Sequence, residues 1–497
     1  MKLIFTSLFV LTMFGYSLNA QTQGIAYTAV GKGVATTFVT DYHCLGINSS
    51  ALGWGTGYED KKFTLGMTEF SFGIYSDSLN SDKLKKLYRT IRNDMTGKEQ
   101  DPANWAEQVS YAADYMRSGI MMDAQYNWFG FSYQSENFGG IAFNIQEHYN
   151  WYSRLSPQTT ELIFEGKFSD YFDQLTVVYG TDTTLIENSG NISEDTLNHV
   201  VMGTITTPLM LSDITSGSEI RFAWNRYYNL GYGRKLFGDS TFSIFAGVAG
   251  RFIQSTAMFS MSSDEDGLLF YSSVSPSFDI DYGSVANTNP SNFTETGSIP
   301  KSVGNGYGLD FSVSTQFLNI FKVGLAVNNI GSVKYKRNVY RVKDSIVGDM
   351  TLDGLSNYNI TGSLDQFLES GGILSLEGQE EISINNNANI RIGGSVDFGK
   401  RVSVGFDFVA PFNSDNPGGI QNPVYSFGGD VRPFKWLTLS AGYYGGGIYK
   451  HNIPVGINFV IANGTYEFGI SSRDALAFFT KGSNSISTAF GIMRFRF

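Results

Sequence analysis

Connections of two very different lengths alternate in strict order along this 497-residue chain. They separate about 14 segments in which apolar and polar residues alternate with period two, the pattern of a β-strand with two unlike faces. Even-numbered connections are tight, such as 399–401 (GKR), whereas most odd-numbered ones are long. Tight turns at one end and long loops at the other are typical of an up-and-down barrel that crosses a membrane with its strands.

The alternation is plain in VSVGFDF, where Val402, Val404 and Phe406 alternate with Ser403 and Gly405. The even strand count and the position of both barrel ends on the tight-turn side also suit a bacterial membrane barrel. A β-sandwich with Greek-key crossovers has no reason to separate its connections in this way. We therefore predict an all-β membrane protein, an antiparallel barrel over residues 61–497. The expected strands are 61–74, 120–134, 138–151, 216–236, 241–256, 305–318, 322–345, 386–398, 402–410, 423–432, 437–447, 453–461, 465–472 and 484–497.

Composition supports this class. Charged residues make up 16 % of the chain, below the quarter that is usual for soluble proteins, and aromatic residues make up 15 %. The mean hydropathy of −0.12 is too low for a bundle of membrane helices. The net charge of −11 argues against a nucleic-acid partner, because proteins that bind nucleic acids are usually basic.

The first twenty residues, MKLIFTSLFVLTMFGYSLNA, have the organisation of a secretory signal peptide. Lys2 precedes an apolar core over 3–16, and Ala20 ends a small-residue cleavage site. We expect cleavage after Ala20 and a location in the outer membrane of a Gram-negative cell. Cys44 is the only cysteine, so an intramolecular disulfide is excluded.

The mature N-terminus, residues 21–60, is rich in glycine and shows no sustained alternation. Close packing of glycine backbone inside a barrel lumen would account for that composition, so we interpret this stretch as a plug. An extra strand pair or a disordered tail is the alternative. The long outer loops are expected at 75–119, 152–215, 257–304 and 346–385. Helical periodicity appears over 81–118 and about 158–175, and 260–300 has the composition of a mobile loop.

Taken together, the signal peptide, the glycine-rich N-terminal stretch ending in GINSSALGW and the strand count resemble the FadL-like superfamily. These outer-membrane barrels transport long-chain fatty acids and carry a hatch in the lumen. That family commonly has an Asn-Pro-Ala turn at this point. Here Asn48 and Ala51 remain while Ser49 and Ser50 replace the proline, and the resemblance implies that Asn48, Ser49 and Ala51 form the turn of the plug. The C-terminal sequence, from NIPVGINFV to GIMRFRF, is similar to that of an uncharacterised family of Bacteroidetes-type outer-membrane proteins.

Several polar residues lie opposite the apolar faces of the expected strands and would line the lumen. In that position their charges can form a pathway for a solute, or can simply pair with one another and with the plug; we favour the second role. The residues are Asn144, Gln146, Arg221, Asp310, Arg391, Asp397, Asp407 and Glu467.

No pattern in the chain defines a catalytic or metal site. His43 and Cys44 together supply two ligands suited to a soft metal ion, but a protein metal site needs at least three. Gln146 and His148 share a strand face, but a G-x-S-x-G elbow is missing. The acidic stretch 262–267 (SSDEDG) lacks the ligand spacing of a calcium loop. We expect no enzymatic activity and no cofactor.

The last residues, GIMRFRF, suit the final strand of an outer-membrane barrel. Phe495 and the terminal Phe497 would face lipid and serve the insertion machinery as a signal, with Arg494 pointing into the lumen. Phe490 and Ile492 fall on the arginine face, so either the register breaks near 491 or these two side chains pack on the plug.

Two functions remain open. The first is passive transport of small hydrophobic compounds across the outer membrane, with such a compound as ligand. The second is a structural or partner-binding barrel, such as a secretion or surface-assembly component, without transport. In either case the expected partners include outer-membrane lipid and the barrel-insertion machinery.

Overall fold

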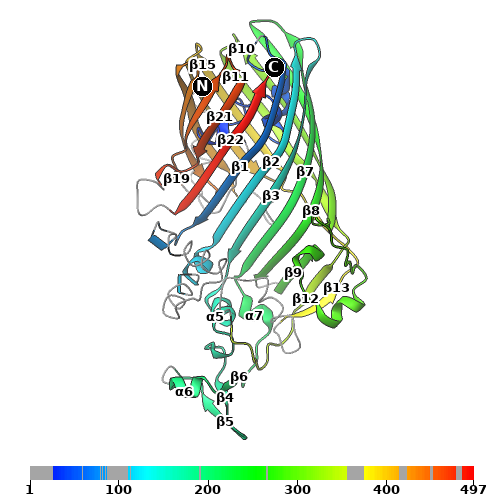
Figure 1. Ribbon diagram of the computed structural model, residues 1–497, viewed down its shortest axis with the longest axis vertical. Helices are drawn as coiled ribbons and strands as arrows, with labels where there is room; N and C mark the ends of the chain where they lie inside the picture. The colour runs from blue at the N-terminus through cyan, green and yellow to red at the C-terminus, as the bar shows by residue number, and fades with distance from the viewer. Residues whose placement is uncertain are drawn as a thin grey trace, which may run out of the picture.

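The computed structural model describes residues 26–58, 60–78, 80, 82–83, 86, 110–111, 113–189, 192–264, 267–354, 374–412, 422–447, 451–476 and 484–497. Within it, 14 strands pair with their neighbours around a closed antiparallel ring, and the last strand pairs with the first (Figure 1). This confirms the predicted barrel, and each expected segment overlaps one ring strand. The ring strands are β1 (Phe63–Ser76), β2 (Ile120–Ser135), β3 (Gly139–Arg154), β7 (Glu219–Gly238), β8 (Phe242–Asp264), β10 (Gly304–Phe317), β11 (Phe321–Tyr335), β15 (Asn389–Phe398), β16 (Val402–Pro411), β17 (Val424–Phe434), β18 (Leu437–Gly446), β20 (Val455–Ile461), β21 (Tyr466–Ser472) and β22 (Ser485–Arg496).

One end of the ring carries the tight turns and the last residue of the chain (Figure 1). Asn319 and Asn463 turn the chain there with φ of 54° and 53°, in the left-handed region that asparagine tolerates. The carbonyl oxygen of Phe497 accepts hydrogen bonds from the backbone N–H groups of Lys62 and Phe63 at 2.7 and 2.9 Å. The two ends of the barrel wall are therefore joined at this rim.

At the opposite end, some strands differ from the sequence prediction. β8 continues to Asp264 and pairs with β9 (Gly267–Val274), so the loop expected over 260–300 is partly strand. β11 ends at Tyr335, and β12 (Val339–Lys343) leaves the ring to pair with β9 and β13 (Ser375–Gly378). A single strand over 322–345 is therefore wrong. The alternation continues through both pieces, and only Asn338, with φ of 49°, marks the break.

A small module extends beyond the long-loop end of the barrel (Figure 1). Its three-stranded sheet has the order β5-β4-β6 and is separate from the barrel sheet. The helix expected over 158–175 ends earlier, because Gly166, with φ of 57°, follows α5 directly. The elements here are α5 (Pro157–Glu165), η3 (Gly166–Phe168), β4 (Gln174–Tyr179), β5 (Asp182–Glu187), α6 (Glu194–Leu197), β6 (Val200–Thr204) and α7 (Leu211–Thr215).

The other outer segments add short elements. Of the helices expected over 81–118, the described residues 110–111 and 113–118 are helical, and most of the remainder lies outside the described residues. The additional elements are η4 (Pro276–Phe278), η5 (Gly283–Thr288), β14 (Ile382–Asn385) and β19 (His451–Asn452).

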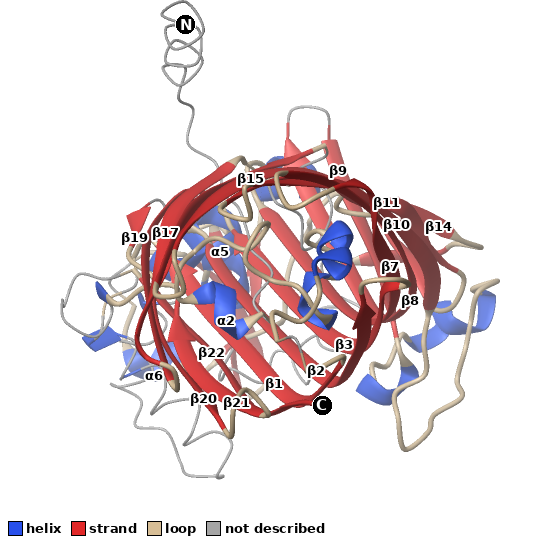
Figure 2. Ribbon diagram, turned by 90° about the horizontal axis from the view of Figure 1, so that it is seen from above, coloured by secondary structure: helices blue, strands red, loops and turns tan. Residues whose placement is uncertain are grey.

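Residues 26–58, which we call the N-terminal segment, lie inside the ring (Figure 2). The segment contains α2 (Tyr27–Val30), η1 (Tyr42–Cys44) and η2 (Ser49–Trp54), linked by turns, and most of its side chains are buried. It therefore forms the core of the barrel near the tight-turn end. The expected signal peptide, 1–20, lies outside the described residues.

Candidate functional site

Inward-facing glycines bring the barrel wall to backbone distance from the N-terminal segment. A Cβ at Gly428 would lie 1.9 Å from the carbonyl oxygen of Lys32, and one at Gly130 would lie 2.3 Å from the ring of Tyr42. Only glycine fits such close approaches. Glycines of this kind occur on all ring strands except β10 and β21: Gly66, Gly130, Gly140, Gly231, Gly233, Gly247, Gly324, Gly393, Gly405, Gly428, Gly442, Gly456 and Gly491.

The two remaining ring strands reach the segment through serine hydroxyls. On β10, the hydroxyl of Ser314 accepts a hydrogen bond from the indole N–H of Trp54 at 3.0 Å. On β21, the hydroxyl of Ser471 donates to the carbonyl oxygen of Tyr27 at 2.9 Å. The segment is thus contacted by every strand of the ring, which fixes its position in the lumen.

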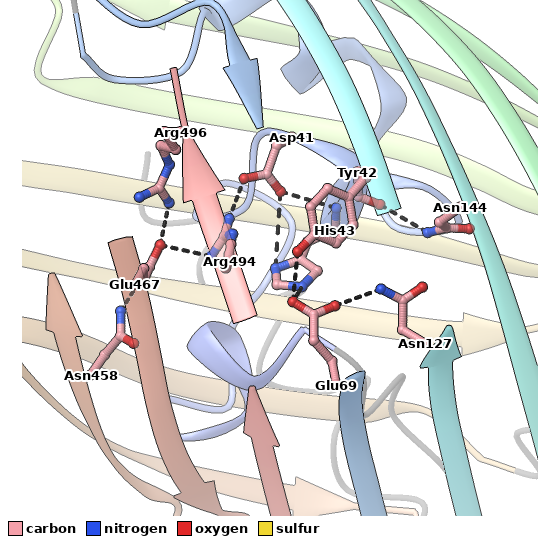
Figure 3. Close-up of polar contacts among 10 residues, drawn as sticks. All are labelled: Asp41, Tyr42, His43, Glu69, Asn127, Asn144, Asn458, Glu467, Arg494 and Arg496. Carbon is pink, nitrogen blue, oxygen red and sulfur yellow. Dashed lines mark hydrogen bonds and ion pairs between the residues drawn. The ribbon is translucent and has the colours of Figure 1, made fainter. Parts of the chain in front are cut away.

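A buried charge network joins the segment to the last two strands (Figure 3). The guanidinium of Arg494 forms an ion pair with Asp41 of the segment and a second one with Glu467 of β21, the latter at 3.0 Å. Arg496 also pairs with Glu467. All four side chains are less than a tenth exposed, so each charge depends on its partners rather than on water.

A second part of the network centres on Glu69 of β1 (Figure 3). Its carboxylate accepts a hydrogen bond from the hydroxyl of Tyr42 at 2.6 Å and lies 2.9 Å from Nε2 of His43. The amide of Asn127 on β2 donates to its other oxygen at 2.7 Å, and Asn144 on β3 donates to the carbonyl oxygen of Tyr42 at 3.1 Å. The first three strands therefore hold η1 through polar groups.

The far side of the ring makes two further attachments. Lys32 forms a buried ion pair with Asp430 of β17 at 2.5 Å. Asp407 of β16 accepts hydrogen bonds from the backbone N–H groups of Ala35 and Thr36 at 2.7 and 3.0 Å. Asp430 thus neutralises a charge of the segment, and Asp407 satisfies two backbone N–H groups where the segment has little regular structure of its own.

The predicted turn at Asn48, Ser49 and Ala51 is a buried structural element. The side-chain amide of Asn48 donates to the carbonyl oxygen of Thr36 at 2.8 Å, and its oxygen accepts from the hydroxyl of Ser50 at 2.6 Å. The backbone N–H of Ala51 donates to the carbonyl oxygen of Asn48 at 3.1 Å. Side-chain hydrogen bonds therefore hold the turn without a proline.

The eight polar residues named from the strand pattern have protein partners. Asp310 pairs with Arg251 at 3.1 Å, Arg391 with Asp407 at 3.7 Å and Asp397 with Lys322 at 2.9 Å. Arg221 pairs with Glu219, and Gln146 bonds His148 at 3.0 Å. Asn144 and Glu467 belong to the network of Figure 3. The strand pattern missed Asp41, Glu69 and Asp430, since contacts between residues so distant in sequence leave no local pattern.

Between the N-terminal segment and the long loops, the residues that line the lumen change from charged to apolar. Asp123 and Arg473 form a buried ion pair at 3.3 Å. Next to it, a cavity of about 20 Å³ is lined by residues that include Ala35, Arg391 and Tyr444, enough for about one water molecule. Further out, an apolar cluster of inward-facing side chains joins β1 and β2 to β16–β18 across the lumen: Tyr75, Met121, Val409, Val424 and Tyr444, with Tyr152 packed against them.

The motifs considered for chemistry have structural contacts. His43 and Cys44 are buried inside the segment, and among the described residues no three His, Cys, Asp or Glu side chains form a group that suits a metal ion. Two residues of the acidic stretch 262–267 lie outside the described part of the chain, and its first three residues belong to β8.

At the C-terminus, Phe497 is 58 % exposed and Phe495 is partly exposed on the outer face, with Arg494 buried inside. Both Ile492 and Met493 are exposed, and the pairing of β22 with β21 shifts by one residue between Gly491 and Arg494. The register therefore breaks there, which places Ile492 on the outer face rather than against the N-terminal segment.

In the described ranges, no helix combines the length and the hydropathy needed to span a membrane. Among solved structures, the chain is similar to the toluene transporter TodX of Pseudomonas putida at 10 % identity and a TM-score of 0.42, covering 97 % of this chain and 99 % of that one. The corresponding values for the toluene transporter TbuX of Ralstonia pickettii are 13 %, 0.41, 96 % and 99 %. For a FadL homologue of Pseudomonas aeruginosa they are 10 %, 0.36, 96 % and 97 %. The FadL-like superfamily stays a resemblance of the sequence, because similarity at these identities and TM-scores carries no argument about this chain.

No curated protein matches the sequence. A family model described as "Family of unknown function (DUF5723)" matches residues 180–463, which is more than half of the chain. This span runs from the outer module to the tight turn after β20 and so includes most of the barrel wall. The chain therefore belongs to the family of unknown function DUF5723.

Proposed function

We propose that this protein is an outer-membrane barrel that admits small hydrophobic compounds passively, with the N-terminal segment as the plug of its lumen. The observation that carries the proposal is the apolar cluster above the segment. Its members come from strands on opposite sides of the ring, so they form an apolar layer across the lumen rather than a patch on one wall. Such a layer favours an apolar solute and disfavours water and ions.

The lumen differs on the two sides of this apolar layer. On the long-loop side lies the outer surface of the cell in a barrel of this kind. On the tight-turn side, the charge pairs and glycine contacts close the wall around the plug, and the cavity between Ala35 and Arg391 has room for about one water molecule. A hydrophobic compound would therefore collect in the apolar layer before it meets the plug.

Uptake into proteoliposomes tests the proposal. The full mature chain should accelerate uptake of labelled toluene or a labelled long-chain fatty acid over vesicles without protein. A variant lacking residues 24–57 should change that rate and also admit a small sugar. A Val424→Trp variant of the full chain, which narrows the apolar layer without removing the plug, should slow uptake. Unchanged uptake in both variants would contradict transport through the lumen.

A second candidate function, binding of a protein partner, is favoured by the outer module. Residues 155–218 contain nine acidic side chains but only one basic side chain, Lys167, which pairs with Asp353. β5 stands at the edge of the module's sheet, and Leu185 on it is 59 % exposed. An exposed edge strand can accept a strand from another chain. Deleting 170–206 should then abolish partner capture while leaving uptake unchanged.

A further inference from the structure

The outer surface of the barrel has a groove across β11 and β15–β18, with a volume of about 680 Å³. Its floor consists of small residues: Gly394 on β15, and Gly429 and Ala441, which are paired on the neighbouring strands β17 and β18. Its walls are large apolar side chains that face outwards and are exposed: Phe321, Val323, Val404, Phe406, Phe427 and Tyr443. In a membrane barrel, this surface faces the hydrocarbon of the bilayer.

A band of basic residues borders the groove at the tight-turn end. Lys400 and Arg401 form the turn between β15 and β16, and Arg432 and Lys435 stand at the turn between β17 and β18. All four are exposed, and none has a carboxylate partner among the described residues. Arg401 precedes Val404 by three positions, about 10 Å along an extended strand, so the basic rim lies beyond the tight-turn end of the groove.

Aromatic side chains mark the depth of these charges in the membrane. Phe398, Phe434 and Trp436 are exposed on the same turns, and the rings of Phe434 and Trp436 are stacked at 5.3 Å. Belts of this kind lie at the level of the lipid headgroups. On the tight-turn side, the headgroups belong to the periplasmic leaflet.

We propose that this groove, together with Lys400, Arg401, Arg432 and Lys435, is a binding site for one anionic glycerophospholipid of the periplasmic leaflet. An acyl chain would lie over Gly394, Gly429 and Ala441, and the phosphate would lie among the four basic side chains. Charge complementarity selects an anionic headgroup over a zwitterionic one, because a basic cluster attracts net negative charge at a membrane surface. The inference rests on the proposed membrane location but not on transport.

The groove can be filled without disturbing the wall. Ala441 already carries a Cβ on the outer face, so Ala441→Phe adds bulk over the floor of the groove. Ala246→Phe makes the same change on the outer face of β8, outside the groove, and is the matched control. Gly429 is unsuitable, since a Cβ there would lie 2.1 Å from the carbonyl oxygen of Ser403.

Native mass spectrometry on protein from nanodiscs with equal amounts of phosphatidylglycerol and phosphatidylethanolamine provides the test. The unmodified protein should retain one phosphatidylglycerol, at least about fivefold over phosphatidylethanolamine. Ala441→Phe should lose the retained lipid, whereas Ala246→Phe should keep it. Equal retention of the two lipids, equal behaviour of the two variants, or a dimer in place of a lipid adduct would overturn the proposal.

The headgroup is tested separately by changing Lys400, Arg401, Arg432 and Lys435 together to Gln. This variant should lose the preference for phosphatidylglycerol. The control changes Lys61, Lys62, Arg234 and Lys235 to Gln, which removes the same charge near the same rim but away from the groove. Loss of preference in both variants would mean a non-specific charge effect and would overturn the site. Because lipid retention needs no uptake, its failure is distinguishable from failure of transport.

Discussion

Arg494 of the last strand forms an ion pair with Asp41 of the N-terminal segment, although 453 positions separate the two residues in the sequence. Both side chains are almost completely buried. Because β22 also pairs with β1, this ion pair attaches the segment at the seam where the ring closes. The attachment of the N-terminal segment and the closure of the barrel wall are therefore coupled.

Replacing Asp41 by Ala should destabilise the folded barrel by about 3–5 kcal/mol, since it leaves the buried Arg494 with one carboxylate instead of two. Urea unfolding, followed by the gel mobility of unheated samples, measures the loss. The double variant D41A/R494A removes both partners, and we expect it to lose less stability than the sum of the single variants. Additive losses would contradict coupling between the segment and the seam.

Replacing Gly428 by Ala should weaken the fit of the plug, because the added methyl would lie 1.9 Å from the carbonyl oxygen of Lys32. We expect a loss of about 1–3 kcal/mol in unfolding free energy, as for other overpacked interiors, and a raised ion conductance in planar bilayers. Gly250→Ala is the control, because its Cβ would face only Leu309 at 3.9 Å. If both variants conduct alike, the close fit does not seal the lumen.

Widening the apolar layer should raise transport. Tyr444→Ala removes a buried ring from that layer, so uptake of labelled toluene by proteoliposomes should increase severalfold. Tyr425→Ala removes an equal ring from the outer face of the adjacent strand β17, where Tyr425 is 42 % exposed, and should leave uptake unchanged. Unaltered uptake in the Tyr444 variant would place the path outside this layer.

The terminal aromatic should matter for insertion more than for stability. Phe497→Ser keeps the backbone bonds to Lys62 and Phe63 but removes the exposed ring. We expect a severalfold smaller folded fraction in the outer membrane, measured by gel mobility, with little change in urea unfolding of the fraction that inserts. Phe317→Ser, at the same rim but within the chain, is the control. An equal defect in both would argue against a terminal signal.

The outer module should loosen in acid. Hydrogen bonds from Thr206 hold the pKa of Asp173 below its ordinary value of 3.8. A folded-state pKa that is lower than the unfolded one stabilises the fold above the unfolded pKa, and that contribution is lost as the pH falls through the folded pKa. Limited proteolysis near 206 should therefore rise modestly below about pH 4. Asp173→Asn should show the raised cleavage at neutral pH and little further change in acid.

The sequence alone determined the barrel and its strand order. Period-two alternation, as in Val402 to Phe408, places apolar side chains on the lipid face whatever their neighbours are, and the alternation of turn and loop lengths fixes which ends face the same side. For that reason, every ring strand overlaps one of the expected segments, although some ends differ, as at β8. Where alternation persists across a turn, as at Asn338, the pattern does not show that β12 leaves the ring.

Only the tertiary structure determined which residues meet inside the lumen. The inward positions of Arg494 and Asp407 follow from strand parity, but their partners do not, because Asp41, Ala35 and Thr36 lie in a segment without periodicity. The glycines of the wall are spread over the whole chain, and only closure of the ring brings them against that segment. Likewise, the groove over Gly394, Gly429 and Ala441 exists only because strand pairing aligns small residues that are far apart in sequence. Local pattern specifies which face a side chain takes, whereas contact across a closed ring requires the three-dimensional arrangement.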